Sequence, residues 1–186
     1  MQTTQILNSW TPDALTVGIG LLVVRLALGL TLAAHGAQKL FGWFGGYGIA
    51  GTGGFFEQIG FRPGRLFATA AGLSEFAGGL LTALGLLGPV GPALIVSVMI
   101  VAIASVHWRN GFFMSSQGIE YTLVNAAAAV ALGLAGPGVF SLDALFGLES
   151  LWAPRIAWAV LALGIVGAAA NLATRRQAPA ETAVAR

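Results

Sequence analysis

The sequence predicts an all-α integral membrane protein, with a core of four transmembrane helices followed by a fifth, C-terminal one. Three observations support this fold class. Hydrophobic residues make up 56% of the 186-residue chain and charged residues only 9%, against about 25% charged residues in an ordinary soluble domain. The apolar residues occur in five long runs, and turns rich in glycine and proline separate several of them. A bilayer span needs about 20 apolar residues, so these runs are long enough, or nearly so, to cross a membrane.

Each apolar run is assigned to one span, in chain order. The expected spans are 15–39, 65–87, 90–107, 119–135 and 152–174. The third and fourth are short and can tilt little in the bilayer. Helix-breaking turns follow the second, third and fourth spans, at Gly88-Pro-Val-Gly-Pro92, Asn110-Gly111 and Gly136-Pro137-Gly138.

The segment 41–64, between the first two spans, is rich in glycine and aromatic residues. Aromatic rings gather at headgroup depth, so we expect a short interfacial helix around 54–59, beneath the inner leaflet. Such a helix can serve as a simple interfacial anchor or as a lid over the helix bundle, and both interpretations stay open.

The distribution of basic residues predicts the orientation. With the N-terminus outside, the outer loops hold only Arg155. The inner side then holds Lys39, Arg62, Arg65, Arg109, Arg175, Arg176 and Arg186. The opposite orientation would reverse this bias. We therefore expect the N-terminus outside and the C-terminus inside, which requires an odd number of spans.

The chain divides into a transmembrane core at 1–147, which includes the aromatic loop 41–64, an additional transmembrane helix at 148–174, and a tail at 175–186 that we expect to be disordered. Residues 1–12 lack the basic start and short apolar core of a cleaved signal peptide. The chain has no cysteine, which excludes disulfides, thiolate catalysis and a cysteine-ligated cluster. A net charge of +2 does not indicate a nucleic-acid partner.

Charged residues inside the apolar runs are the first functional candidates. A central charge in hydrocarbon costs about 2.5 kcal/mol or more, so such residues usually face a partner, a cavity or a site. Counting 1.5 Å per residue from the inner ends of the first two spans puts Arg25 and Glu75 at similar depth. The helical face that carries Glu75 otherwise holds small residues, which favour close helix packing. We predict a buried Arg25–Glu75 pair, which either fixes helix register or takes part in function.

A second polar group is expected near the inner boundary. It comprises His35, Lys39, His107, Glu120, Tyr121 and Asn125. His35 and Lys39 share one helical face, and His107 and Glu120 lie at the inner ends of their spans. Such a pocket suits a quinone headgroup, because histidine and lysine can donate to its carbonyls while glutamate or histidine relays protons. The alternative is that these side chains only extend toward the water at the interface.

Other ligands fit the sequence less well. His35 and His107 are possible axial haem ligands, but no spacing motif connects them. Adding Glu75 and Glu120 gives no known metal-ligand pattern, so no metal site is predicted. The stretch 46–51 matches G-x-G-x-x-G. A membrane helix precedes it where a dinucleotide-binding unit has a strand, so no dinucleotide site is predicted either.

Several short motifs occur in a characteristic order. They are His35-Gly36-x-x-Lys39, Glu75-x-x-Gly78-Gly79, Gly111-Phe112-Phe113, Gly118-x-Glu120-Tyr121 and Gly136-Pro137-Gly138-x-x-Ser-Leu-Asp143. With the glycine and aromatic loop, this order resembles the DoxX family of bacterial membrane proteins over roughly 25–147. The resemblance implies a four-helix core in the bacterial inner membrane and an association with quinone-linked redox enzymes such as thiosulfate:quinone oxidoreductase. The family motif residues would be Arg25, His35, Lys39, Glu75, Glu120 and Tyr121. The fifth helix inherits nothing from this resemblance.

The expected function is therefore a membrane subunit of a quinone-linked redox system that contributes a quinone headgroup site. No catalytic residue is assigned, and whether the chain is an enzyme by itself stays open. The alternative is a non-catalytic scaffold that docks partner proteins through its aromatic inner loop. A small-molecule or proton carrier is a third class, without support from internal repeats. Small-residue pairs such as Gly29/Ala33 and Gly164/Ala168 also suit a homo-oligomer.

Overall fold

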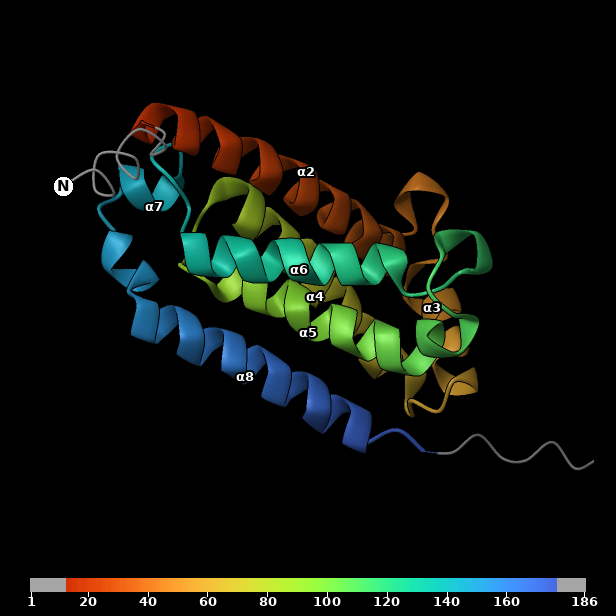
Figure 1. Cartoon of the computed structure of the whole chain (residues 1–186). Helices are drawn as coiled ribbons and strands as arrows, with labels where there is room; N and C mark the ends of the chain where they lie inside the picture. Colours follow the sequence, from red (N-terminus) through yellow and green to blue (C-terminus); the bar gives the residue numbers. More distant parts are fainter. Residues whose placement is uncertain (1–12, 177–186) are drawn as a thin grey trace, which may run out of the picture.

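The computed structural model describes residues 13–176, which form a bundle of helices (Figure 1). The helices are α2 (Ala14–Phe41), α3 (Gly48–Gln58), α4 (Gly64–Leu84), α5 (Val90–Ala102), α6 (Glu120–Ala135), α7 (Leu142–Leu145) and α8 (Pro154–Ala173). A π-helical turn at Ile103–His107 continues α5. Short 3-10 turns lie at Trp43–Gly45, Trp108–Asn110, Met114–Ser116 and Glu149–Trp152. The described residues contain no strand, so the predicted all-α class is confirmed.

Four helices are long and apolar enough to cross a membrane. They are Ala14–Phe41, Gly64–Leu84, Val90–Asn110 and Pro154–Ala173. The helix α6 is apolar but has 16 residues, or about 24 Å at 1.5 Å per residue, against some 30 Å of hydrocarbon. It runs within the bundle beside α2 and α5 (Figure 1). A fifth span and the orientation of the chain stay predictions.

A helix is present where a short interfacial one was expected around 54–59: it is α3, which begins earlier, at Gly48. Its place at a membrane interface stays a prediction. It lies across one end of the bundle and packs on the start of α4 (Figure 1). We call this the α3 end, and the opposite end, which carries α7, the α7 end. Aromatic side chains before α3 are exposed, and Tyr47 has 84% of its surface accessible. Phe61, after α3, is fully buried.

The helices α2 and α4 form the most extensive helix contact in the bundle. A Cβ atom on Gly36 would lie 2.3 Å from the backbone nitrogen of Phe76, and one on Gly29 would lie 2.5 Å from the carbonyl oxygen of Gly79. Real Cβ atoms do not approach backbone so closely, so glycine is what lets the two helices touch.

The small-residue pairs considered for self-association are used inside the chain. Gly29 packs on α4, and a Cβ atom on Gly164 would lie 2.7 Å from the carbonyl oxygen of Ala93 on α5. Their partners Ala33 and Ala168 are buried as well. Neither pair is free to hold a second copy of the chain.

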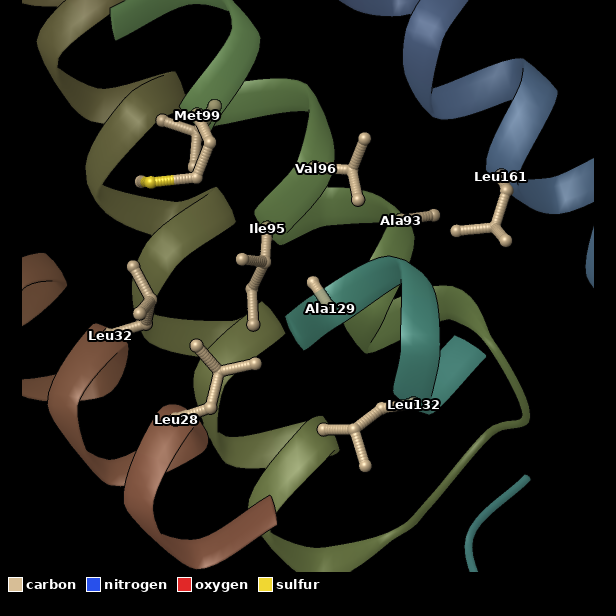
Figure 2. Close-up of a cluster of buried hydrophobic side chains, with 10 residues drawn as sticks. Leu28, Leu32, Ala93, Ile95, Val96, Met99, Ala129, Leu132 and Leu161 are labelled. Carbon is tan, nitrogen blue, oxygen red and sulfur yellow. The ribbon is translucent and has the colours of Figure 1, made fainter. Parts of the chain in front are cut away.

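The hydrophobic core lies where α5 meets α2, α6 and α8 (Figure 2). Ile95 on α5 is fully buried between Leu28 of α2 and Leu132 of α6, and Leu161 of α8 joins the same cluster. The α8 helix is thereby part of the bundle core.

Asp143 fastens the loop after α6 to the turn between α4 and α5, at the α7 end. Its buried carboxylate accepts hydrogen bonds from the backbone N–H groups of Leu87 (3.0 Å) and Gly88 (2.7 Å) and from the indole Nε1–H of Trp152 (2.7 Å). These bonds join two separate parts of the chain, the turn between α4 and α5 and the turn before α8, to one side chain, so this motif residue has a structural role.

The end of α8 is tied to the segment after α3. The Arg175 guanidinium donates from Nε to the carbonyl oxygen of Ile59 at 2.7 Å, and the Arg176 N–H donates to the carbonyl oxygen of Gly60 at 2.9 Å. These two residues belong to the tail that was predicted to be disordered from residue 175, and in the structure their hydrogen bonds hold them against the segment that follows α3. The remainder of that tail, 177–186, lies outside the described residues.

Candidate functional site

A cavity of about 390 Å³ opens at the α3 end between α2, α3, α4, the end of α5, α6 and the end of α8. Ligand pockets have volumes of roughly 300–1,000 Å³ and mostly apolar walls. The apolar walls here include Phe55, Phe67 and Met99. The polar lining consists of His35, Lys39, Ser74, Glu75, Ser97, Ser105, His107, Tyr121, Thr122 and Asn171. An apolar space with a few convergent polar groups is the usual form of a small-molecule site.

The strongest polar feature of this cavity is an ion pair between Lys39 of α2 and Glu75 of α4. Glu75 is buried, and the close contact of α2 with α4 brings the lysine Nζ to its carboxylate Oε2. A buried carboxylate needs such a partner, because desolvation otherwise costs several kcal/mol.

The predicted Arg25–Glu75 pair is wrong, although both residues are buried as expected. Arg25 lies at the α7 end, where it donates to the carbonyl oxygen of Phe140. A Cβ atom on Gly85 would lie 1.9 Å from its Nη1 atom, so Arg25 packs against the last residues of α4. Glu75 lies toward the other end, beside Lys39.

The depth estimate failed because it set the start of α4 level with the end of α2. A Cβ atom on Gly72 would lie 3.3 Å from Cβ of Lys39, so Lys39 is level with Gly72, about two helical turns beyond Arg65. The first turns of α4 pack on α3 instead, and a Cβ atom on Gly53 would lie 3.0 Å from the backbone nitrogen of Arg65. This offset brings Lys39, and not Arg25, to Glu75.

Beside the ion pair, an imidazole and a phenol from two helices pack against each other at the cavity wall. The rings of His35 on α2 and Tyr121 on α6 have centroids 5.6 Å apart. The buried hydroxyl of Tyr121 lies near the amide nitrogen of Asn125, one turn further along α6. Neither atom has a hydrogen bond of good geometry among residues 13–176. Because a hydroxyl can both donate and accept, that of Tyr121 can still donate to a ligand or to water while the amide lies beside it.

His107 borders the cavity from the π-helical turn. Its Nδ1 lies 2.7 Å from the carbonyl oxygen of Gln117, which orients the ring. In the same turn, the Ser105 hydroxyl donates to the carbonyl oxygen of Val101 at 2.6 Å. Turns of π-helix inside α-helices frequently occur at functional sites, and this one forms part of the cavity wall.

The structure thus brings together four of the six residues predicted for the headgroup pocket and adds Glu75 to them. Glu120 and Asn125 do not line the cavity. The Glu120 carboxylate accepts a hydrogen bond from the Met114 N–H at 2.8 Å, which shapes the loop before α6.

Sequence reasoning missed Asn171, because α8 was treated as a separate addition to the core. A signal was present, since a polar side chain in an apolar span is itself a functional hint. The aromatic residues of α3 that line the cavity, Phe55 and Phe56, belong to the segment for which an interfacial anchor and a lid over the bundle were both left open.

A second cavity of about 520 Å³ lies under the glycine-rich side of α3. Both cavities are lined by Lys39, Phe55 and Phe56. Lys39 therefore stands between the two spaces.

Within residues 13–176, no three His, Asp or Glu side chains are grouped as metal ligands.

Comparison with known proteins identifies one part of the chain. A family model described as DoxX matches residues 20–108, which include most of α2 and all of α3, α4 and α5. No curated protein and no solved structure matches the chain. The helices α6 and α8, and the motifs after residue 108, lie outside the matched region. Together with the four apolar helices, the match describes a multi-pass membrane protein. Residues 20–108 of the chain therefore match the DoxX family, as the order of the sequence motifs predicted.

Proposed function

We propose that the protein is a bacterial inner-membrane subunit of a quinone-linked redox system and that the cavity at the α3 end binds the quinone headgroup. The observation that supports this most is the joining of an apolar cavity with the Lys39–Glu75 pair and the facing rings of His35 and Tyr121. A quinone has the matching chemistry, with an apolar ring and two carbonyl oxygens that accept hydrogen bonds.

The polar groups can serve both redox forms of such a ligand. Lysine, tyrosine and imidazole N–H groups can donate to a quinone carbonyl, while a carboxylate or imidazole nitrogen accepts from a quinol hydroxyl. His35 and Glu75 are also suited to move the protons that accompany quinone reduction or quinol oxidation. The electrons would be exchanged with a partner subunit.

The second cavity supplies a path for these protons. Lys39 lines both cavities, so a proton can pass from Glu75 to the water under α3 without crossing the apolar core. By the positive-inside rule, the α3 end faces the cytoplasm, since the chain segments there carry most of the Lys and Arg residues.

The test uses purified full-length protein in lipid nanodiscs. Bound quinone is quantified after solvent extraction, and affinity is measured with ubiquinone-1, a quinone with a short tail. We expect Glu75→Gln to weaken ubiquinone-1 binding about tenfold or more, because a hydrogen bond to a charged group contributes roughly 1.5–3 kcal/mol. The matched control is Glu149→Gln, since this carboxylate is exposed and lies outside the cavity.

Equal affinity of the wild type and Glu75→Gln, with the variant folded, would remove Glu75 from the site. A wild type that carries no quinone and binds none would refute the proposed function. Proteins that co-purify with such a quinone-free wild type would favour the scaffold alternative, with the exposed aromatic residues before α3 as the docking surface.

A further inference from the structure

The helix α8 contributes one residue, Asn171, to the lining of the cavity, although it lies outside the DoxX region. Between residues 156 and 173 its sequence is apolar except for Asn171. That residue lines the cavity. The buried residues of this helix are Ala157, Leu161 and Ala168, all apolar, while Asn171 is half-buried. Hydrophobic packing therefore explains the buried face of α8 but not the amide at position 171.

The Asn171 side chain has an unused hydrogen-bonding atom. Its Oδ1 is buried and has no hydrogen-bond partner within residues 13–176. Leaving a buried acceptor unpaired costs about 1–3 kcal/mol, and a leucine or alanine would avoid this cost. An amide at this position is understandable if a molecule in the cavity completes its hydrogen bonds.

The position of Asn171 is held by the residues one turn beyond it. Arg175 donates from Nε to the carbonyl oxygen of Ile59 at 2.7 Å and from Nη2 to that of Ser105 at 3.4 Å. Its guanidinium also lies 6.0 Å from the ring centroid of Phe61. Because Ile59 and Ser105 both line the cavity, Arg175 anchors α8 to two other walls of the same space. This arrangement places the Asn171 amide at a defined position.

The Asn171 amide and the Lys39–Glu75 ion pair enter the cavity from different sides of the bundle. The helix α8 packs on α5 and α6, whereas Lys39 and Glu75 come from α2 and α4 (Figure 1). A ligand that contacts both must carry polar groups at two separate positions on an apolar body. A ring with two oxygen substituents, as in a quinone or quinol, meets this requirement.

We infer that Asn171 is a ligand-binding residue of the cavity, whose Oδ1 accepts a hydrogen bond from a hydroxyl group of the ligand, as a quinol provides. The helix α8 is then part of the binding site, together with residues of the region that matches the DoxX family. The identity of the ligand as a quinone rests on the function proposed above, but the exposure of Asn171 to the cavity does not.

The first test compares Asn171→Leu with the wild type for binding of ubiquinol-1, the reduced form of ubiquinone-1, in nanodiscs. We expect affinity to fall about fivefold, the effect of one lost hydrogen bond, with no loss of thermal stability. Leu163→Ala is the matched control on the same helix, since Leu163 is exposed and does not line the cavity. Unchanged affinity in Asn171→Leu, while the wild type binds, overturns the inference and leaves the proposed function standing.

The second test needs no knowledge of the ligand. The natural chain has no cysteine, so a single introduced thiol can be followed with methyl methanethiosulfonate. Only the thiolate reacts, and it forms where water reaches the sulfur. Asn171→Cys should react nearly as fast as Thr174→Cys at the exposed end of the helix, and Leu163→Cys, facing lipid, should not.

These two tests separate the proposals. If the wild type binds no ubiquinone-1, the quinone function fails, and labelling then decides the inference. Reaction of Asn171→Cys supports a cavity position open to small molecules, whereas labelling as slow as that of Leu163→Cys overturns it.

Discussion

The two ends of the bundle bury a carboxylate in different ways. At the α7 end, the Asp143 carboxylate accepts three hydrogen bonds from three separate residues. At the α3 end, Glu75 pairs with one lysine, which has a quarter of its side-chain surface exposed, and both residues line a cavity. The first arrangement is closed, and the second leaves hydrogen-bonding capacity for a ligand. A buried charge in an apolar helix therefore marks a binding site only where a cavity and unused hydrogen-bonding groups accompany it.

Removing the Asp143 carboxylate should have the largest effect on stability. Asp143→Ala leaves two backbone N–H groups and the Trp152 indole without acceptors, at about 1–3 kcal/mol each. We expect a loss of about 3–5 kcal/mol in the free energy of unfolding, measured by thermal unfolding in nanodiscs, or roughly 6–20 °C in midpoint for a chain of this size. Glu149→Ala, an exposed carboxylate on the same side, is the control.

The folded Asp143→Ala protein should still bind ubiquinone-1 with wild-type affinity, since Asp143 does not line the cavity. A large loss of affinity without a loss of stability would contradict the division into a structural end and a binding end.

Adding a methyl group at Gly36, in the contact between α2 and α4, should lower stability by an intermediate amount and should disturb the α3 end of the bundle. A Cβ atom there would lie 2.3 Å from the Phe76 backbone nitrogen, next to Glu75. Overpacking of this kind costs about 1–3 kcal/mol. We expect Gly36→Ala to lower the unfolding midpoint and also to weaken ubiquinone-1 binding, because α2 carries Lys39 and His35.

Gly20→Ala provides the matched control on the same helix, since no atom lies within 4 Å of the added Cβ. Its stability should be unchanged or slightly raised, because alanine is the better helix former. Equal behaviour of the two alanine variants would show that α2 and α4 are farther apart than the structure has them.

Replacing Arg25 should have the smallest effect. Its guanidinium donates to Phe140, and its Nε and Nη1 atoms have no partner among the described residues. Replacing buried charges by apolar residues of similar size is often neutral or stabilising. Thermal unfolding of Arg25→Met should therefore show a midpoint equal to or above that of the wild type, with Arg155→Met as the exposed control. A loss above about 2 kcal/mol would indicate a binding partner for Arg25, and the α7 end would then carry a site of its own.

Much of the candidate site follows from local sequence patterns. His35 and Lys39 share one face of α2 because residues four apart do so in any α-helix, and both line the cavity. His107 and Tyr121 were expected at the same depth because they border one short loop, and they also meet there. Glu120 lies in the same stretch, but its carboxylate is engaged by the backbone of that loop, and hydropathy carries no information about such local hydrogen bonds.

The sequence by itself determined the fold class, the helix positions and the burial of Arg25 and Glu75, because hydropathy, helical period and the cost of a charge in hydrocarbon act locally along the chain. Which cation pairs with Glu75 depends on how far α4 is shifted along α2 in the folded bundle, and no local pattern in the sequence determines this shift. Glycine contacts between the two helices, and the packing of the first turns of α4 on α3, set that offset. The tertiary structure likewise decided that α8 brings Asn171 to the cavity, because contacts between distant helices depend on packing in three dimensions and not on the pattern of any one of them.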